Sequence, residues 1–305
     1  MRAVAFQEFG GPDVLRIIDT PVPAPGPGQV RVRVAASPVN PVDVRARAGV
    51  FGSMLPTRDL YVPGVEFAGH IEALGPEVSG FAVGQPVIGL LPWLSNPVGS
   101  NAEYLVAAAD TLAAAPSGVD LVAAATLPLN GITADLVVAE LGPIAGQTVL
   151  VTGAAGGVGG YAVQLAAAAG AQVIGMAGAG DEQLVRSLGA TRFVARSATI
   201  DSIRALGIDA VIDAAELGAE ILPVVREGGR FVAVLPPTLP ESERGITVTT
   251  VFQAPDGPRL AALVALVEAG TLTLRVAETL PFTEAATAHA RFEKGGLRGR
   301  LVLIP

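Results

Sequence analysis

Residues 149–180 read VLVTGAAGGVGGYAVQLAAAAGAQVIGMAGAG, a stretch without a single charged side chain. It opens with an apolar, strand-like run at 149–151, turns through several glycines, continues as an alanine-rich run and ends in a second strand-like run at 172–174. This order within about 30 residues is typical of a dinucleotide-binding βαβ unit. A membrane span is the alternative for a chargeless stretch. Glycines and Gln164 interrupt this one, and no Lys or Arg cluster flanks it, so we favour the βαβ unit.

The glycine-rich turn has the form Gly153-x-x-Gly156-x-x-Gly159. We expect the first glycine to make a tight turn, the middle ones to let the backbone approach a ligand, and the last to let the helix pack closely on the strand. A helix beginning near Gly156 presents N–H groups and a positive dipole end to a pyrophosphate. A glycine-rich turn without a ligand is the alternative. The predicted cofactor contacts here are Gly153, Ala155, Gly156, Gly157, Val158 and Gly159.

The end of the second strand bears on the choice between NAD and NADP. An NAD site usually carries an acid there for the ribose 2′-hydroxyl, whereas this chain continues with Gly175-Met176-Ala177-Gly178-Ala179-Gly180. Asp181 and Glu182 follow only later and argue mildly against a phosphate. Arg196 is the candidate for binding a 2′-phosphate, with an ordinary solvated arginine as the alternative. We predict NADP(H), with Ala177 and Gly178 as further contacts.

Composition sets bounds on the class of protein. A chain of 305 residues suits two domains, and 50% hydrophobic residues support a sizeable core. The net charge of −8 disfavours a nucleic-acid partner. The chain has no Cys, hence no disulfides or thiolate sites, and its first residues lack a signal-peptide pattern. We expect a soluble, cytoplasmic protein without a membrane partner.

The pattern along the chain predicts an α/β fold class with two domains. Residues 1 to about 115 read as short strands broken by Pro and Gly, which indicates an all-β, partly open barrel. From about 120 to 265, strand-like and helical runs alternate, which indicates a Rossmann-type doubly wound parallel sheet. The tail 275–305 returns to strand-like sequence. We predict a barrel domain of residues 1–118 and 270–305 and a dinucleotide-binding domain of residues 119–269.

At this point the chain resembles the medium-chain dehydrogenase/reductase superfamily, and within it the zinc-free quinone oxidoreductase branch related to zeta-crystallin. The resemblance implies a GroES-like N-terminal barrel, a Rossmann domain and a small-molecule substrate. The matching segments are Met1-Arg2-Ala3-Val4, Gly10-Gly11-Pro12, Asn40-Pro41-Val42-Asp43, Pro63-Gly64-Val65-Glu66-Phe67-Ala68-Gly69, Ala102-Glu103-Tyr104, Gly131-Ile132-Thr133-Ala134, the glycine turn and Arg298-Gly299-Arg300-Leu301-Val302.

The sequence predicts no metal site. The zinc branch of the superfamily uses Cys, His and Glu or Asp, but this chain has no Cys and only His70 and His289. A catalytic zinc needs about three protein ligands. The family's Gly-His-Glu motif reads Gly64-Val65-Glu66 here, so its histidine is missing. We interpret Glu66 as a structural carboxylate and both histidines as structural.

The resemblance also implies site residues. Asn40, Asp43 and Thr133 are the catalytic candidates: Asn40 would donate through its amide near nicotinamide and substrate, Asp43 would shape that loop, and Thr133 would contact the nicotinamide end. An Asn-Pro turn is the alternative for Asn40. Relatives often carry tyrosines after this loop, where Arg45 and Phe51 stand here. Candidates for an apolar substrate pocket are Phe51, Leu55 and Trp93. Further cofactor candidates are Ala214, Ala215, Val251, Phe252, Gln253 and Arg300.

These observations predict an NADPH-dependent, metal-free oxidoreductase that transfers hydride to a quinone or an α,β-unsaturated carbonyl. The alternatives are a zinc-free aldehyde or ketone reductase and a non-catalytic NADP-binding protein, because fold does not fix activity. The resemblance further implies a homodimer formed through edge strands near residues 246–252, since an exposed apolar edge invites pairing.

Overall fold

The computed structural model describes residues 1–92 and 98–305, which form two compact units. The first, called the β unit below, comprises Met1–Leu129, Ala254–Glu268 and Leu274–Pro305. The second, called the α/β unit, comprises Asn130–Gln253 and Ala269–Thr273. Trp93, a predicted substrate contact, lies outside the described residues.

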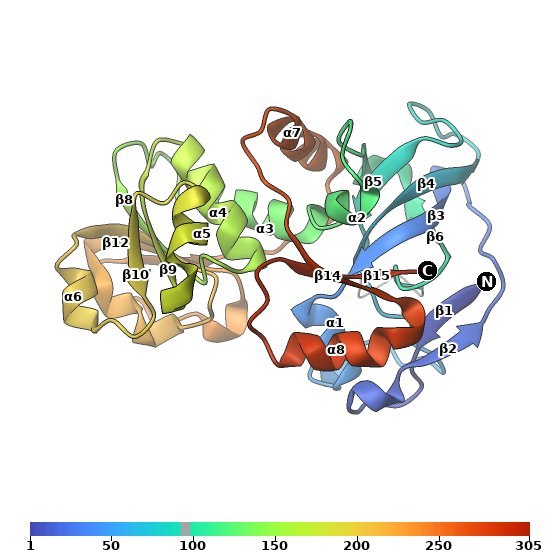
Figure 1. The fold of residues 1–305 in the computed structure, drawn as a ribbon, viewed down its shortest axis with the longest axis horizontal. Helices are drawn as coiled ribbons and strands as arrows, with labels where there is room; N and C mark the ends of the chain where they lie inside the picture. Colours follow the sequence, from blue (N-terminus) through green and yellow to red (C-terminus); the bar gives the residue numbers. More distant parts are fainter. Residues whose placement is uncertain (93–97) are drawn as a thin grey trace. The chain divides into compact units, whose positions relative to one another are not determined.

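The α/β unit contains one six-stranded sheet in the order β10-β9-β8-β11-β12-β13, and all neighbouring strands are parallel (Figure 1). The chain starts in the middle with β8, moves outward to β10 and returns to the other side as β11. This confirms the predicted doubly wound sheet, in which ligands bind at the carboxyl ends of the strands beside the reversal. The strands are β8 (Thr148–Thr152), β9 (Gln172–Ala177), β10 (Arg192–Ala195), β11 (Ile208–Asp213), β12 (Val225–Ala233) and β13 (Thr247–Thr250).

Helices follow the first three strands of this sheet. They are α4 (Gly157–Ala168), α5 (Glu182–Ser187) and α6 (Ile200–Arg204), while α3 (Pro128–Glu140) precedes β8. Val149, Leu150 and Val151 of β8 are fully buried, as is Ala162 of α4. The chargeless stretch is therefore a strand and a helix that are both buried, which explains why it needs no polar face.

The β unit is built on a seven-stranded sheet in the order β14-β15-β3-β4-β5-β7, with β6 paired to β3. A separate pair, β1 and β2, is antiparallel. The C-terminal β15 pairs with β3, so the tail of the chain lies in the same sheet as N-terminal strands. The strands are β1 (Arg2–Ala5), β2 (Arg16–Asp19), β3 (Gln29–Pro38), β4 (Glu66–Leu74), β5 (Pro86–Leu90), β6 (Tyr104–Ala108), β7 (Leu112–Ala114), β14 (Val276–Pro281) and β15 (Arg300–Ile304).

Four α-helices lie wholly within the described part of the β unit. They are α1 (Pro41–Arg47), α2 (Leu121–Ala124), α7 (Gly257–Glu268) and α8 (Ala285–Glu293). The sequence places α7 in the dinucleotide-binding domain, but the structure groups it with the β unit. The reason is close packing: a Cβ on Gly257 would lie 2.3 Å from the carbonyl oxygen of Asp110, so the start of α7 touches the turn before β7.

Among residues 1–92 and 98–305, no helix combines the length and the apolar character needed to cross a membrane.

Candidate functional site

A pocket of about 450 Å³ opens at the carboxyl ends of β8, β9 and β11 in the α/β unit. This is the edge at which a doubly wound sheet binds nucleotides. Four predicted cofactor contacts line it: Gly153, Ala177, Arg196 and Ala215. The other lining residues are Thr152, Met176, Ala198, Ile200, Ile203, Leu217, Glu220 and Ile221.

The glycines of the turn are required by close backbone approaches. Gly153 has φ +60°, and a Cβ there would lie 3.1 Å from the carbonyl oxygen of Ala214. A Cβ on Gly159 would lie 2.2 Å from the carbonyl oxygen of Gly153, so only glycine lets α4 pack this closely on the turn. Helix α4 starts at Gly157, with Gly156 as its N-cap. The turn therefore provides a cradle and a helix N-terminus suited to a pyrophosphate.

A buried polar pair fixes the floor of this pocket. The Thr152 hydroxyl donates to Asp213 Oδ1 at 2.6 Å, joining the ends of β8 and β11. The same hydroxyl oxygen accepts the Ala215 N–H at 3.0 Å, and Asp213 Oδ2 accepts the Gly218 N–H at 2.8 Å. Sequence analysis missed both side chains. A sequence signal that could have found them is a polar residue at the end of an apolar, strand-like run, as at Thr152 and Asp213.

Arg196 lies where the end of β9 meets the pocket. Its backbone N–H donates to the carbonyl oxygen of Ala177 at 2.8 Å. Its Nη2 lies 3.7 Å from the position a Cβ on Gly178 would take, and Asp181 Oδ2 lies 2.9 Å from that same point. At the end of β9, the Arg196 guanidinium and the buried Asp181 carboxyl group therefore both lie close to Gly178, which has no side chain.

The other predicted residues of the α/β unit have different surroundings. Thr133 is buried on α3. Val251, Phe252 and Gln253 follow β13; Val251 is buried and Phe252 is 76% exposed. None of these four residues lines the pocket described above. The same holds for the remaining predicted contacts of the glycine turn and its neighbours: Ala155, Gly156, Gly157, Val158, Gly159, Gly178 and Ala214.

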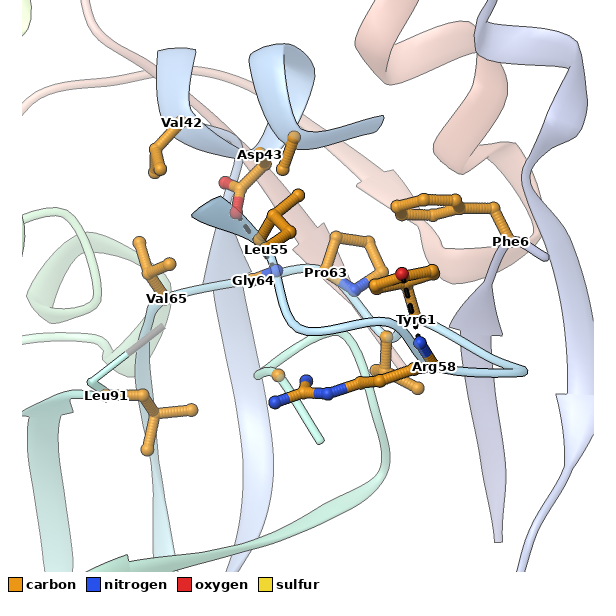
Figure 2. A pocket seen from close by; sticks show the side chains of 13 residues that line it. Phe6, Val42, Asp43, Leu55, Arg58, Tyr61, Pro63, Gly64, Val65 and Leu91 are labelled. Carbon is orange, nitrogen blue, oxygen red and sulfur yellow. Dashed lines mark hydrogen bonds between the residues drawn. The ribbon is translucent and has the colours of Figure 1, made fainter. Parts of the chain in front are cut away.

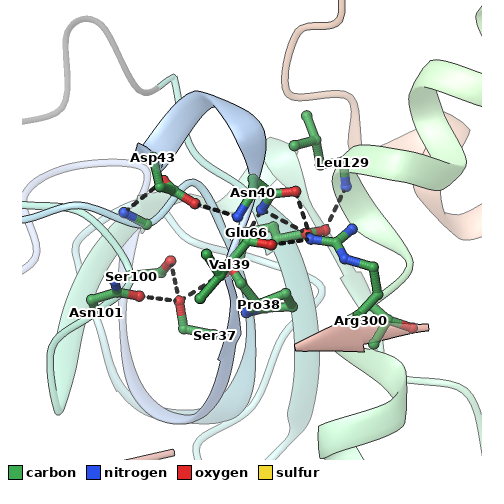
Figure 3. A network of polar contacts seen from close by, with 12 residues as sticks. Ser37, Pro38, Val39, Asn40, Asp43, Glu66, Ser100, Asn101, Leu129 and Arg300 are labelled. Atoms are coloured by element: carbon green, nitrogen blue, oxygen red, sulfur yellow. Dashed lines mark hydrogen bonds and ion pairs between the residues drawn. The ribbon is translucent and has the colours of Figure 1, made fainter. Parts of the chain in front are cut away.

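A second polar cluster lies in the β unit, around the fully buried carboxylate of Glu66 on β4 (Figure 3). Arg300 Nη2 on β15 donates to Glu66 Oε1 at 2.8 Å, and the Leu129 N–H donates to Glu66 Oε2 at 2.8 Å. Asn40 Nδ2 donates to Glu66 Oε1 at 2.9 Å. Glu66 is therefore a structural carboxylate that holds three segments of the unit together.

The amide of Asn40, expected to donate to a substrate, is engaged by protein groups on both sides. Nδ2 donates to Glu66 and to the carbonyl oxygen of Pro38, while Oδ1 accepts from Arg300 Nη2 at 2.5 Å. An amide nitrogen has two N–H groups, and both have acceptors here. Arg300, expected to bind cofactor, directs Nη2 to Asn40, Glu66 and the Val39 carbonyl oxygen; its buried Nη1 has no partner among the described residues.

Asp43 closes the N-terminus of α1. Its Oδ2 accepts the Asn40 N–H at 2.9 Å, and its Oδ1 accepts the Gly64 N–H at 3.0 Å. Burial raises the pKa of Asp43 to about 7 and Glu66 adds to the shift, while the two N–H groups and Arg300 oppose it. A carboxyl with this pKa exchanges a proton near neutral pH.

Asp43 also faces a cavity of about 40 Å³ within the β unit (Figure 2). Leu55, a predicted substrate contact, lines this cavity, whereas Phe51 does not. The full lining comprises Phe6, Val42, Asp43, Ala46, Leu55, Arg58, Tyr61, Val62, Pro63, Gly64, Val65, Leu91 and Gly99. Apart from Asp43, Arg58 and Tyr61, these residues carry no polar side chain.

In the part of the chain that the structure describes, no three His, Cys, Asp or Glu side chains are grouped so as to hold a metal ion. Glu66 is the acid of the zinc branch's Gly-His-Glu motif. Here it accepts hydrogen bonds from Arg300, Asn40 and the Leu129 N–H. His289 is buried on α8, and both of its ring nitrogens lack partners among described residues.

Two family models match the chain. Residues 26–117 match the alcohol dehydrogenase GroES-like domain, and residues 188–303 match the zinc-binding dehydrogenase family. The predicted GroES-like barrel is thereby confirmed.

The chain also resembles curated proteins along its whole length. It is 34% identical over 330 residues to a quinone oxidoreductase of Lama guanicoe, with 100% of this chain and 97% of the relative covered. It is 32% identical over 319 residues to a chloroplastic NADPH-dependent alkenal/one oxidoreductase of Arabidopsis thaliana, with 100% and 80% covered.

Solved structures of oxidoreductases are also similar to the chain along its whole length. A mycobacterial protein in complex with NADPH superposes with a TM-score of 0.85 at 27% identity, and an NAD-dependent alcohol dehydrogenase with a TM-score of 0.90 at 32% identity. In both cases 100% of each chain is covered. These similarities support a nicotinamide cofactor.

Proposed function

Because the chain belongs to the quinone oxidoreductase branch of the medium-chain dehydrogenase/reductase superfamily, we propose that it reduces quinones or α,β-unsaturated carbonyl compounds with NADPH. The observation that carries this proposal is the pocket at the carboxyl ends of β8, β9 and β11, whose glycine turn needs the positive φ of Gly153 and leaves no room for a side chain at Gly159.

The pocket residues supply binding and orientation for the cofactor. The first turn of α4 binds the pyrophosphate through backbone N–H groups, and Ala177 and Ala215 line the same pocket as Gly153 with short side chains. The nicotinamide supplies the hydride when it is bound. We assign Thr133, Val251, Phe252 and Gln253 to its nicotinamide end by family analogy.

In the β unit we assign Asn40 and Arg300 a positioning role. Both are buried and bind Glu66 and each other, so they fix the start of α1 and with it Asp43. A conjugated acceptor spreads the charge that develops on hydride transfer to its oxygen, where a few donors stabilise it. Leu55 and Phe51 are proposed to contact its apolar part.

The test is NADPH oxidation against a panel of quinones, enones and simple aldehydes. We expect turnover with the conjugated acceptors. Turnover with aldehydes or ketones alone would favour a carbonyl reductase. NADPH binding without turnover of any acceptor would favour a non-catalytic dinucleotide-binding protein.

We propose NADP(H) rather than NAD because Arg196 lines the pocket beside Gly178. An arginine bound to a 2′-phosphate contributes about 1.5–3 kcal/mol, or about 10- to 100-fold in affinity. Arg196→Ala should therefore weaken NADPH binding by that factor and change NADH binding less than about threefold. Arg192→Ala, an exposed arginine of β10, is the matched control. An unchanged NADPH preference in Arg196→Ala would remove the arginine from this role, and the buried Asp181 beside it would then favour NAD.

We further propose a cytoplasmic homodimer that pairs through residues 246–252. Strand β13 (Thr247–Thr250) lies at the edge of its sheet, and Phe252 just after it is 76% exposed. Unpaired edges of this kind invite pairing with a second chain. Sedimentation velocity at micromolar concentration should show a dimer; a monomer alone would contradict the proposal.

A further inference from the structure

Two charged side chains, Arg196 and Glu220, line the nucleotide pocket of the α/β unit. Arg196 directly follows β10, and Glu220 lies in the segment that follows β11. Both are exposed, and within the described residues neither charged group makes a hydrogen bond or an ion pair, either with the other or with a third group. The hydroxyl of Thr152, the third polar side chain of the lining, already donates one hydrogen bond and accepts another. Arg196 and Glu220 therefore keep their hydrogen-bonding capacity for a ligand.

The other side chains of the lining are apolar and come mainly from two segments. Ile200 and Ile203 lie after β10, while Leu217 and Ile221 lie after β11. A volume of about 450 Å³ with apolar walls is typical of sites for small molecules, in which a few polar groups fix the orientation of the ligand. The flat aromatic base is the part of a dinucleotide that suits such walls, whereas its phosphates do not.

Of the two bases of a nicotinamide dinucleotide, the adenine fits this pocket. Arg196, to which the 2′-phosphate is assigned, belongs to the lining, and that phosphate sits on the ribose that carries the adenine. Gly153 of the glycine turn, beside which the pyrophosphate is expected, lines the pocket as well. The residues assigned to the nicotinamide end do not line it. The pocket therefore faces the adenosine half of the cofactor.

The two unpaired groups of the pocket differ in what they can bind. A guanidinium only donates hydrogen bonds and a carboxylate only accepts them. Arg196 therefore matches a phosphate, and Glu220 matches a donor. The base edge of adenine carries one such donor, the 6-amino group. Hypoxanthine has an oxygen at the same position, which is an acceptor and is repelled by a carboxylate.

We propose that Glu220 accepts a hydrogen bond from the 6-amino group of the adenine, and that it thereby selects adenine dinucleotides over those with a 6-oxo purine. This inference rests on the proposed function, because it takes a nicotinamide dinucleotide as the ligand. It applies to NADH as well as to NADPH, since both carry the same base. Glu220 is then the residue that determines base specificity, and Arg196 determines the 2′ substituent.

The test compares NADPH with reduced nicotinamide hypoxanthine dinucleotide phosphate, called the hypoxanthine cofactor below, which differs at position 6 of the base. Fluorescence titration gives the dissociation constant of each cofactor without any turnover. The unmodified protein should bind NADPH at least about tenfold more tightly, the factor expected for one hydrogen bond to a charged group.

Glu220→Gln should bind both cofactors with dissociation constants that differ less than about threefold. A glutamine amide can turn its oxygen toward the 6-amino group or its NH₂ toward the 6-oxygen. The variant should therefore bind the hypoxanthine cofactor more tightly than the unmodified protein does. A gain of affinity for one cofactor is a result that a damaged fold does not produce.

Glu216→Gln is the matched control. Glu216 is an exposed acid of the same segment that does not line the pocket, so its substitution removes the same charge without touching the base. It should leave the ratio of the two dissociation constants unchanged. If the unmodified protein binds both cofactors equally, or if Glu220→Gln keeps the ratio of the unmodified protein, the proposal is overturned.

A carboxylate that binds a ribose hydroxyl instead of the base would change the affinity for both cofactors by the same factor. That outcome also overturns the proposal, because it leaves the ratio unaltered in Glu220→Gln. Equal binding of the two cofactors together with quinone or enone turnover would remove the base selectivity alone. If neither cofactor binds, the proposed function is refuted and the role of Glu220 with it.

Discussion

The Arg300 guanidinium donates to the fully buried Glu66 carboxylate at 2.8 Å, joining strands that are 234 residues apart in the sequence (Figure 3). Glu66 remains in the chain although the histidine that precedes it in the zinc branch is Val65 here. An arginine side chain thus neutralises the acid from within the β unit. This pair fixes Asn40, which binds both partners and begins α1.

Arg300→Met should lower the free energy of unfolding by about 3–5 kcal/mol, because it leaves a buried carboxylate unpaired. The measurement is urea unfolding at pH 7. Arg204→Met is the matched control: its ion pair with Asp201 is 3.2 Å long with both side chains more than half exposed, so its loss should cost less than about 1 kcal/mol. The double variant Arg300→Met with Glu66→Gln should recover part of the loss. Equal effects of the two arginine substitutions would contradict the assigned role.

His289 should make the β unit sensitive to acid. It lies on α8 with its ring fully buried, and Arg47 of α1, which pairs with Glu293, lies close by. Burial first, then the Arg47 charge, lowers the pKa of His289 from 6.5 to about 3. The unfolded chain therefore binds one more proton than the folded chain between these pH values. The stability contributed by neutral His289 is complete above pH 6.5 and falls by about 1.4 kcal/mol per pH unit as the pH drops toward 3.

Urea unfolding of the unmodified protein and of His289→Phe between pH 7 and pH 4.5 measures this effect. In the variant, the free energy of unfolding should no longer fall with pH by the amount that His289 contributes. The difference in unfolding free energy between the two proteins should therefore shrink or reverse as the pH falls. His70→Gln, at the other histidine of the chain, controls for the substitution itself. If the unfolding free energies of His289→Phe and of the unmodified protein change with pH in parallel, the buried imidazole is not the source of the acid sensitivity.

Gly159→Ala should damage both stability and cofactor binding. Its Cβ would lie 2.2 Å from the carbonyl oxygen of Gly153, so α4 must move away from the turn. Forced overpacking of this kind costs about 1–3 kcal/mol, and we expect NADPH affinity to fall with it. Gly180→Ala is the control, because a Cβ there meets no atom within 4 Å. Fluorescence titration with NADPH and urea unfolding measure the two effects. If Gly159→Ala keeps the NADPH affinity and the unfolding free energy of the unmodified protein, the close packing is refuted.

The α/β unit was predictable because its signals are local. Glycine at 153 is needed for a positive φ, and the apolar run 149–151 needs burial on two faces, so both appear in consecutive residues. The roles of Asn40 and Arg300 were not predictable in the same way. Their amide and guanidinium are paired across 260 residues, and nothing in either local sequence names the partner.

The placement of α7 was missed for a related reason. Its sequence follows the last strand of the parallel sheet without a break in pattern, but α7 packs against β7 and the turn before it, where its start lies close to the Asp110 carbonyl oxygen. The link between Thr152 and Asp213 spans 61 residues and was missed as well. In both cases the contacts that decide the structure join residues far apart in the sequence, and neither local sequence identifies its partner.

Thr152→Val tests whether this link shapes the nucleotide pocket. The substitution keeps the volume of the side chain but leaves Asp213 Oδ1 and the Ala215 N–H without the hydroxyl that both now contact. Unpaired buried polar groups cost about 1–3 kcal/mol each, so we expect a loss of about 2–4 kcal/mol in unfolding free energy. Since Ala215 lines the pocket, NADPH affinity should also fall, by about tenfold.

Thr191→Val is the matched control for this last substitution. Its hydroxyl donates to the Val173 carbonyl oxygen at 3.0 Å, at the opposite end of the sheet from the pocket. Loss of that single bond should cost about 1 kcal/mol and leave NADPH affinity unaltered. Isothermal titration with NADPH separates the two variants. If both weaken binding equally, the effect comes from general loosening of the sheet; if only Thr152→Val does, the polar pair between β8 and β11 holds the pocket in its binding shape.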